Sequence, residues 1–582
     1  MRKEIAALRT LMEERGIDVY IVPTCDFHGS EYINEYFSTR KFLSGFTGSA
    51  GTLVITKNDA KLWTDGRYFL QAGIQLDGSG IKLMKSGDPG VSTIEEYLDG
   101  ILGSEKTLGF DGRIVSYETG EAYGKIVVNH NSNMVYDIDL AGEIWKSRPS
   151  LQGKPVYALP VSSTGKSTGQ KLAEIREIMS ECGADRLFIT SLEENAWLYN
   201  LRGNDVKCTP VFFAFSLITQ NDIMLYVFDD AVSADLLPEY VTVRNYYAVM
   251  HDIAELPEGS SISADLKSVS YGLIKSIPDG CRIINRPSPA AELKAVKNET
   301  EIESTKKAHL GDGVAMVEFI SWLKRNIGKM HITEISASDY LESLRRVQDG
   351  FIELSFDTIA GYMQNGAVIH YTATEETDRE LAPEGLFLVD SGGHYTTGTT
   401  DITRTISLGA LTDKMRECYT AVLRGHIDLL LASFAPGTTG HELDRIAREP
   451  IREIGLDYNH GTGHGVGHVL SVHEGPNNIG KRPVTAPITL GMITTDEPGV
   501  YLEGEFGIRI ESEMLCTDNG NGRYSFDNLT LCPYERDAII KEKLTDKQLE
   551  YVNTYHKRVY DALCNRLSPE AAQWLSEATM PL

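Results

Sequence analysis

The sequence lacks closely paired cysteines. Its eight cysteines are scattered over 582 residues, with no Cys-x-x-Cys motif and no repeated spacing. A disulfide framework and a zinc knuckle both need such pairs, so neither is expected. Reduced thiols are typical of the cytosol, and the cysteine usage therefore predicts a cytoplasmic protein.

Long apolar runs and basic residues are also scarce. No stretch approaches the roughly 20 apolar residues that span a bilayer, and the first residues predict an amphipathic helix ending at Gly16 rather than a secretory signal. Lys and Arg total 56 against 82 Asp and Glu, which gives a formal net charge of −26. This charge would repel phosphate groups, so neither nucleic acid nor a membrane is an expected partner.

The N-terminal half contains an internal repeat. Residues 8–22 align without a gap onto the first fifteen residues of 175–190, and each segment predicts a helix, a capping glycine and a buried strand. Residues 54–63 likewise match residues 217–226, two strands around a polar Asn-Asp turn. Two diverged copies of one α/β domain explain both matches.

Proline, serine and glycine divide the chain. The stretch 147–170 is rich in all three and separates the two copies, and Arg-Pro-Ser-Pro ends the second copy. We predict a first α/β domain over 1–160, a homologous domain over 161–287 and a different domain over 288–582. The last of these begins with a helix whose Asn298 has capping-box spacing.

Four histidines crowd the segment NHGTGHGVGHVLSVHEGP, and three of them (His460, His464 and His468) are spaced by four. A helix here would contain four alternating glycines, which cost ~4 kcal/mol relative to alanine. The zinc-protease helix also needs Glu directly after its first His, where this chain has Gly465. In an extended segment, residues four apart lie ~13 Å from one another, so at most one of the three is expected to bind a metal.

Carboxylates stand at the ends of short apolar strands in the same region. Asp390 ends one strand and Asp401 begins another, and pairing of the two strands would bring the carboxylates together. Taken singly, each Asp is better explained as a turn residue, by roughly two to one. Glu497 follows a further strand, and Arg509 and Glu511 share one face of the alternating segment FGIRIE.

One histidine, two aspartates and two glutamates form an oxygen-rich ligand set. Hard divalent ions prefer oxygen ligands, which favours Mn²⁺ and leaves Zn²⁺ and Co²⁺ as alternatives. Four carboxylates carry a charge that two divalent ions would balance. We therefore expect two metal ions with a bridging hydroxide as the nucleophile.

The ordered motifs resemble those of the pitta-bread metallopeptidases. With two repeated domains in front, the whole chain is similar to the three-domain, cytosolic type of Xaa-Pro aminopeptidase (aminopeptidase P). The resemblance implies an α/β fold class, with two creatinase-type domains, a pitta-bread catalytic domain and a helical extension over about 535–582. The motifs that carry it are VDSG, TTDITRT, HGTGHGVG, TDEPG, GIRIE, NGAVIHY and VHEGP.

The resemblance also implies how the metals are held. Asp390 would bind one metal ion, and Asp401 and Glu511 would bridge the two. His464 and Glu497 would complete the coordination of the second ion, and Glu497 would also carry the proton of the nucleophile.

Five further residues receive substrate roles from the resemblance. His370 and His473 would line the cleft, bond the scissile peptide and stabilise the tetrahedral intermediate. His460 would contact the peptide further along, and Tyr501 and Arg509 would shape the pocket for the proline ring. His468 matches no functional position.

The implied reaction is hydrolysis of the bond between an N-terminal residue and a penultimate proline, in short peptides and by a cytoplasmic homodimer. A prolidase would use the same ligands on dipeptides, but its usual two-domain build differs from this chain. A creatinase-type enzyme and a binding-only relative such as a histone-chaperone module would lack the ligand set, which is intact here.

Overall fold

The structure, a computed structural model, describes residues 2–582, which fold into two compact units. The first unit consists of Met1–Leu159 and Lys166–Glu292, and the second of Pro160–Gly165 and Leu293–Leu582. Across residues 2–582, no helix is both long and apolar enough to cross a membrane. The domain limits at residues 160 and 287 stay predictions.

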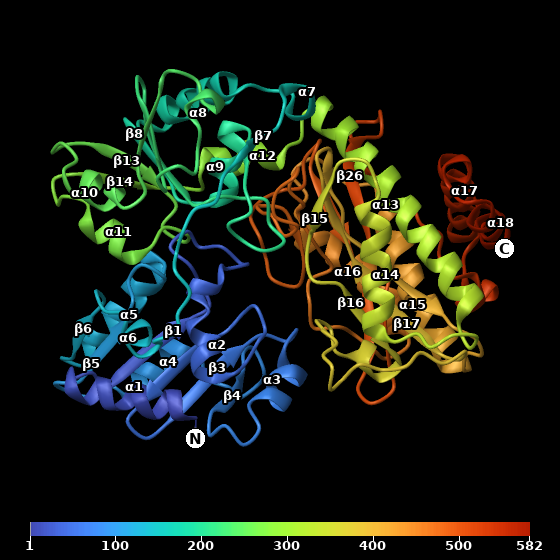
Figure 1. The fold of residues 1–582 in the computed structure, drawn as a ribbon, viewed down its shortest axis with the longest axis horizontal. Coiled ribbons are helices and arrows are strands. Elements are labelled where there is room, and N and C mark those ends of the chain that lie inside the picture. Colours follow the sequence, from blue (N-terminus) through green and yellow to red (C-terminus); the bar gives the residue numbers. More distant parts are fainter. Residues whose placement is uncertain (1) are drawn as a thin grey trace. The chain divides into compact units, whose positions relative to one another are not determined.

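The first unit contains two six-stranded sheets of identical topology (Figure 1). The strands of the first sheet are β1 (Val19–Pro23), β2 (Thr52–Thr56), β3 (Ala60–Thr64), β4 (Lys82–Lys85), β5 (Thr107–Phe110) and β6 (Asn133–Val135). Those of the second are β8 (Arg186–Ile189), β10 (Ala214–Thr219), β11 (Ile223–Val227), β12 (Val241–Asn245), β13 (Ser261–Ala264) and β14 (Arg282–Asn285).

The two sheets match position by position. Their strand orders are β4-β3-β2-β1-β5-β6 and β12-β11-β10-β8-β13-β14. In each sheet two neighbouring strand pairs are antiparallel: β3-β2 and β2-β1 in the first sheet, and β11-β10 and β10-β8 in the second. The other three pairs of each sheet are parallel. This correspondence confirms the repeat predicted from the sequence.

Local chemistry sets the start of each copy. Helices α1 (Lys3–Glu14) and α8 (Thr168–Cys182) each end near a glycine in the left-handed region, Gly16 with φ +68° and Gly183 with φ +71°. Residues with a Cβ rarely adopt this conformation, so the glycines allow the chain to reverse from helix into strand. The remaining elements of this unit are α2 (Thr39–Ser44), α3 (Phe69–Gln75), α4 (Ile94–Ile101), α5 (Tyr117–Asn129), α6 (Leu140–Ile144), α9 (Leu192–Tyr199), α10 (Ala248–Ala254), α11 (Tyr271–Ser276), β7 (Tyr157–Ala158) and β9 (Leu201–Arg202).

The second unit surrounds several small antiparallel sheets with long helices. Its helices are α7 (Val161–Thr164), α13 (Glu299–Asn326), α14 (Glu334–Arg346), α15 (Asp413–Leu430), α16 (Gly440–Glu453), α17 (Asp546–Leu563) and α18 (Pro569–Ala578), and α12 (Pro289–Ala295) contains the boundary between the units. Its strands are β15 (Phe351–Leu354), β16 (Ile359–Tyr362), β17 (Leu386–Ser391), β18 (Gly393–Tyr395), β19 (Gly398–Thr399), β20 (Ile402–Ser407), β21 (Gly463–His464), β22 (Asn478–Ile479), β23 (Ile493–Asp496), β24 (Gly499–Leu502), β25 (Phe506–Arg509), β26 (Ser512–Asp518) and β27 (Tyr524–Asn528).

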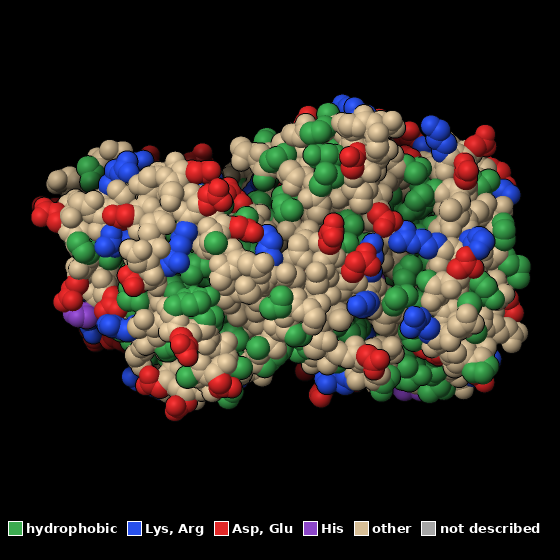
Figure 2. All heavy atoms as spheres, turned by 90° about the horizontal axis from the view of Figure 1, so that it is seen from above, with side chains coloured by type: hydrophobic (Ala, Val, Ile, Leu, Met, Phe, Trp, Pro, Cys, Tyr) green, Lys and Arg blue, Asp and Glu red, His purple; other side chains and the backbone are tan. Residues whose placement is uncertain are grey.

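Helix α13 begins at the predicted capping box. The Asn298 side chain accepts hydrogen bonds from the backbone N–H groups of Thr300 and Glu301, and the Glu301 side chain returns to the backbone of Asn298. Helix α13 then packs against α14 and α18, and its buried side chains join the apolar cores of the unit. On the face shown in Figure 2, acidic and basic side chains are interspersed.

Candidate metal centre

Two paired strands bring Asp390 and Asp401 together. Strands β17 and β20 are antiparallel, with Asp390 opposite Thr403, and Asp401 directly precedes β20. The chain between the two strands forms the short strands β18 and β19. The strand pairing expected from the sequence is therefore present, and both carboxylates are buried.

Main-chain hydrogen bonds fix the two glutamates. Glu511 lies between β25 and β26, and its N–H donates to the carbonyl of Thr403 at 3.0 Å. Glu497 follows β23, and its N–H donates to the carbonyl of Thr462 at 2.7 Å. Each glutamate is thus held against a neighbouring segment that carries another site residue.

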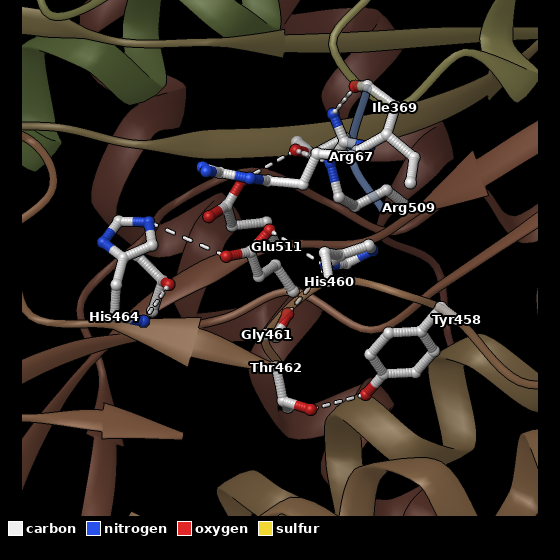
Figure 3. Close-up of polar contacts among 12 residues, drawn as sticks. Arg67, Ile369, Tyr458, His460, Gly461, Thr462, His464, Arg509 and Glu511 are labelled. Atoms are coloured by element: carbon white, nitrogen blue, oxygen red, sulfur yellow. Dashed lines mark hydrogen bonds and ion pairs between the residues drawn. The ribbon is translucent and has the colours of Figure 1, made fainter. Parts of the chain in front are cut away.

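His464 lies in a short extended segment rather than in a helix. Strand β21 pairs His464 with Asn478 of β22, and a Cβ at Gly463 or Gly465 would collide with neighbouring backbone. The predicted absence of a helix over 460–468 is confirmed, and the close approach of other backbone explains two of the glycines. Tyr458 and Thr462 point toward one another beside this segment, with a hydroxyl–hydroxyl distance of 2.6 Å (Figure 3).

The imidazole of His464 is oriented for metal binding. Its Nδ1 lies 3.0 Å from the carbonyl of Gly465 and must donate a proton to it. Nε2, the nitrogen that binds a metal ion in the neutral ring, then faces the carboxylates, 3.5 Å from Asp401 Oδ2 and 3.7 Å from Glu497 Oε1. A hydrogen bond of this kind on one ring nitrogen is what fixes the metal-binding tautomer.

The ligand atoms form overlapping groups. Atoms within 4.8 Å of one another occur in three sets: Asp390, Asp401 and Glu511; His464, Glu497 and Glu511; and Asp401, His464 and His473. Asp401, Glu511 and His464 belong to two sets each, and of these three only the carboxylates have two oxygens with which to bridge adjacent ions.

Unsatisfied oxygens show that a cation fits this site. Among residues 2–582, Asp390 Oδ1 and Asp401 Oδ1 are buried and have no hydrogen-bond partner. Buried carboxylate oxygens are costly unless a donor or a metal ion compensates them. Arg509 already neutralises part of the charge, with Nη2 2.5 Å from Asp390 Oδ2. One or two divalent ions would therefore bring the site about equally near to neutrality, and the overlapping ligand sets, not the charge, favour two.

Burial and mutual repulsion raise the pKa values of these carboxyls. Burial raises the pKa of Asp401 and of Glu511 well above the usual range, and the neighbouring carboxylates raise both further. Burial also raises the pKa of Glu497 to about 7, against the opposing effect of His464. Without metal, the carboxyl of Glu497 is therefore protonated below about pH 7 and charged above it.

Metal affinity should consequently fall in acid. Because a metal ion must displace the proton held by Glu497, whose pKa is about 7, we expect the apparent Kd for Mn²⁺ to rise about tenfold from pH 8 to pH 6. Isothermal titration calorimetry of the metal-stripped protein in buffers of different ionisation enthalpy measures both the Kd and the released protons. A Kd that is constant over this range would contradict the expected proton displacement.

A chain of hydrogen bonds runs from the carboxylates to His460. Arg509 Nη1 donates to the Tyr501 hydroxyl at 2.7 Å, and that hydroxyl donates to His460 Nε2 at 2.8 Å, because His460 Nδ1 must donate to the Gly461 carbonyl. Arg509 also reaches the Ile369 carbonyl at 3.4 Å (Figure 3). The three residues expected to bind substrate are thus linked to one another.

The two remaining histidines differ in how closely they approach the carboxylates. The rings of His473 and His464 lie edge to face, with centroids 4.3 Å apart, and His473 is within ligand distance of Asp401 and His464. His370 lies in the turn that follows Ile369 and is half-buried. It belongs to none of the three ligand sets found within residues 2–582.

Comparison with known proteins decides the family. Residues 303–518 match "Metallopeptidase family M24" and residues 522–582 the "C-terminal region of peptidase_M24", whereas residues 4–148 and 147–301 each match a "Creatinase/Prolidase N-terminal domain". Aminopeptidase P1 of Arabidopsis thaliana is 37% identical over 645 residues, which cover 100% of this chain and 99% of that protein. The chain belongs to metallopeptidase family M24, among the Xaa-Pro aminopeptidases (aminopeptidase P).

Two further members of the Xaa-Pro aminopeptidases support this assignment. Xaa-Pro aminopeptidase 1 of Dictyostelium discoideum is 37% identical over 608 residues, covering 100% of this chain and 96% of that protein. The crystal structure of X-prolyl aminopeptidase from Caenorhabditis elegans, described as a cytosolic enzyme with a di-nuclear active site, has 33% identity and a TM-score of 0.96 over 100% of this chain and 99% of that one. The predicted fold class, creatinase-type domains followed by a pitta-bread domain, is confirmed.

Thr403 is a further site residue of this M24 chain that was not predicted from the sequence. Its hydroxyl donates to Glu511 Oε2 at 2.7 Å and accepts from Arg509 Nε at 3.2 Å, so it orients both side chains. The signal was available, because Thr403 lies two residues after Asp401 on an alternating strand and therefore shares its face. This threonine links the two residues that the alternation of FGIRIE placed on one side.

His468, which no family role explains, connects three segments of the second unit. It is buried, with Nδ1 3.2 Å from the Thr305 hydroxyl of α13 and Nε2 3.0 Å from the Ser163 carbonyl of α7. Because the carbonyl can only accept, Nε2 carries the proton and Nδ1 accepts. Its contacts are those of a structural residue.

We expect His468→Ala to reduce stability but not catalysis. Removing two buried hydrogen bonds should lower the free energy of unfolding by about 1–3 kcal/mol, and kcat/KM should stay within about twofold because the ring bonds Thr305 and Ser163 rather than site carboxylates. Urea unfolding and steady-state kinetics measure the two effects. His251→Ala, at a histidine whose side chain is 67% exposed, is the matched control and should change neither. A hundredfold loss of kcat in His468→Ala would show that the residue acts in catalysis.

Proposed function

We propose that this metallopeptidase removes the N-terminal residue from short peptides whose second residue is proline, with two divalent metal ions, most suitably Mn²⁺. The observation that carries the proposal is the overlap of the three ligand sets. Two of the sets share Glu511, and two share Asp401. Relatives named Xaa-Pro aminopeptidase over the full length of the chain supply the substrate class.

The proposed ligands follow the overlap of the sets. Asp390 would hold one ion, Asp401 and Glu511 would bridge, and His464 and Glu497 would hold the other. When bound, such ions polarise the substrate carbonyl and lower the pKa of a water molecule to near neutrality. An oxygen-rich set with a single imidazole favours Mn²⁺ over the alternatives Zn²⁺ and Co²⁺.

Protein groups would handle the proton and the peptide. Burial raises the pKa of Glu497 to about 7, and a carboxyl in this range can accept a proton and return it near neutral pH. His473, beside His464, and His370 would donate hydrogen bonds to the scissile peptide as its carbonyl oxygen gains negative charge.

The pocket side chains would accept a proline ring. An X-Pro bond has no N–H group, so specificity has to come from the shape of the pocket rather than from a backbone donor. Arg509 is buried and donates to the hydroxyl of the half-buried Tyr501, and that hydroxyl donates to His460, so the three side chains restrain one another. The three side chains would therefore enclose the ring and guide the following residues.

The setting proposed for this enzyme is the cytoplasm, as for the C. elegans protein described as cytosolic. A homodimer is proposed from the family resemblance, and light scattering of the purified protein would test it. Nucleic acid and membranes are not proposed as partners, because the chain carries a net charge of −26.

The decisive test compares three peptides with metal-stripped protein reconstituted with Mn²⁺. Arg-Pro-Pro should release arginine, and Arg-Ala-Pro should be cleaved at a rate at least about a hundredfold lower, since a site built for a ring loses that contact. Arg-Pro alone distinguishes a prolidase, which would cleave this dipeptide and leave the tripeptide intact. Absence of cleavage of Arg-Pro-Pro with Mn²⁺, Zn²⁺ or Co²⁺ would refute the proposed function.

A further inference from the structure

A buried ion pair includes the residue that follows His473 of the proposed site. Lys294 Nζ is 2.5 Å from Glu474 Oε1, and the two side chains are only 5% and 4% exposed. Glu474 is the residue after His473, and Lys294 belongs to the part of α12 that lies in the second unit. Neither residue has a role in the proposed chemistry.

The lysine is the charge partner on which Glu474 depends. Among residues 2–582, neither carboxylate oxygen of Glu474 has a hydrogen-bond partner, so the contact with Lys294 compensates its charge. Lys297 is buried as well; burial lowers its pKa, and the charge of Glu474 acts in the opposite direction. A buried carboxylate held in this way resists displacement, because moving it away from the lysine would leave both charges uncompensated.

The backbone of Glu474 is tied to the segment that carries His464. Its N–H donates to the Gly465 carbonyl at 2.8 Å, and the Gly465 N–H donates to the Asn477 carbonyl at 2.9 Å. A Cβ at Gly465 would collide with the Glu474 carbonyl, and one at Gly467 with the Glu474 carboxylate. Two of the alternating glycines are therefore needed because Glu474 packs against them.

These contacts connect Glu474 to the segments of both histidines. His473 is the residue directly before Glu474. His464 is the residue directly before Gly465, whose carbonyl accepts the hydrogen bond from the Glu474 N–H. The two imidazole rings are in contact, with centroids 4.3 Å apart, and both have a nitrogen within 4.8 Å of a carboxylate oxygen of Asp401. The position of one buried carboxylate thus sets the relative position of two groups that the reaction needs.

We propose that Glu474, anchored by Lys294, is a positioning residue that holds His473 and His464 in their productive arrangement. The inference rests on the proposed function, in which His473 bonds the scissile peptide and His464 binds metal. Residues that orient ligands in this way typically change metal affinity or activity by 10–100-fold when they are replaced.

The test removes both charges at once. In Glu474→Gln, Lys294 is left buried without a carboxylate, so the Tm should fall. In the double variant K294M/E474Q, the Tm should return to that of the unchanged protein, because removing both members of a buried pair is close to neutral. The kcat on Arg-Pro-Pro at saturating Mn²⁺ should nevertheless remain about tenfold low, with KM within about twofold, because an interaction made in the transition state is lost.

A matched control separates positioning from stability. Asp312 and Arg345 form another buried ion pair of the second unit, with Nε and Oδ1 2.8 Å apart and side chains 4% and 0% exposed. The variant D312N/R345M should recover Tm and retain the kcat of the unchanged protein. If K294M/E474Q recovers kcat together with Tm, the ion pair is merely structural and the inference is wrong.

Two further measurements keep the inference testable in every case. Glu474→Asp retains the charge but shortens the side chain, so it should fold and still lose about tenfold in kcat; an unchanged kcat would overturn the inference even if the double variant did not fold. If the unchanged protein cleaves no X-Pro peptide, the proposed function fails by itself. The apparent Kd for Mn²⁺ then decides, since K294M/E474Q should bind about tenfold more weakly, and equal affinity would refute positioning.

Discussion

Replacing Asp401 by Asn should abolish metal binding and lower kcat/KM by at least about a thousandfold, equivalent to ~4 kcal/mol of transition-state stabilisation. Asp401 shares ligand distance with Asp390 and Glu511 on one side and with His464 on the other, so its loss weakens both proposed metal positions. An amide of the same shape has one fewer acceptor oxygen and no charge. Calorimetric titration with Mn²⁺ and hydrolysis of Arg-Pro-Pro measure the two losses.

The stability of the variant shows whether the damage is local. Burial, and then Asp390, raise the pKa of Asp401, so a charged carboxylate is unfavourable there without metal. The metal-free Asp401→Asn protein should therefore be at least as stable as the metal-free parent, while losing the Tm increase that Mn²⁺ gives the parent. Asp205→Asn, at a buried carboxylate of the first unit, should keep both metal binding and activity. Near-normal turnover in Asp401→Asn would disprove the proposed site.

The fold was largely predictable because it repeats itself. A helix, a glycine and a buried strand recur in residues 8–22 and 175–190, and both glycines do adopt the left-handed conformation that ends the helix. Strand order within each sheet could not be read from the sequence, since long-range pairing leaves no local pattern. The identical order of the two sheets could be expected once the repeat was recognised.

The carboxylate site was predictable to a different extent. The glycines of the segment around His464 excluded a helix on energetic grounds, and the structure has an extended segment there. The contacts that give those glycines their purpose, such as Glu474 against Gly467, join residues whose proximity depends on a folded loop. The pairing of Lys294 with Glu474 spans 180 positions in the chain, and no spacing rule indicates it.

Charge balance was the weakest part of the sequence argument. It counted four carboxylates and inferred two divalent ions, but Arg509 lies 2.5 Å from Asp390 and contributes a positive charge of its own. Charge alone then no longer distinguishes one ion from two. The distinction comes from geometry, because Asp401 and Glu511 each belong to two ligand sets.

We expect metal-stripped protein to bind two Mn²⁺ ions per chain and to gain stability with them. Without metal, the raised pKa of Glu497 makes the folded state less stable as pH rises from the ordinary pKa of 4.5 to about 7, because the carboxyl ionises in the unfolded chain while the buried one still holds its proton. Bound cations reverse this penalty. At a hundredfold excess over Kd, each ion adds about 2.7 kcal/mol if it binds only the folded state, so two add roughly 5 kcal/mol. Metal analysis after dialysis gives the stoichiometry, and urea unfolding at pH 8 gives the stabilisation.

The location of the stabilisation distinguishes this site from incidental metal binding. Amide hydrogen exchange should slow on addition of Mn²⁺ in the segments that carry the ligands, 386–408, 460–476 and 493–514, and should be unchanged in the first sheet of the first unit. The exposed acidic side chains of this chain would bind Mn²⁺ weakly and without such localisation. A saturating stoichiometry of one ion would mean that Asp401 and Glu511 do not bridge, and the overlap of the ligand sets would then reflect a single ion with alternative ligands.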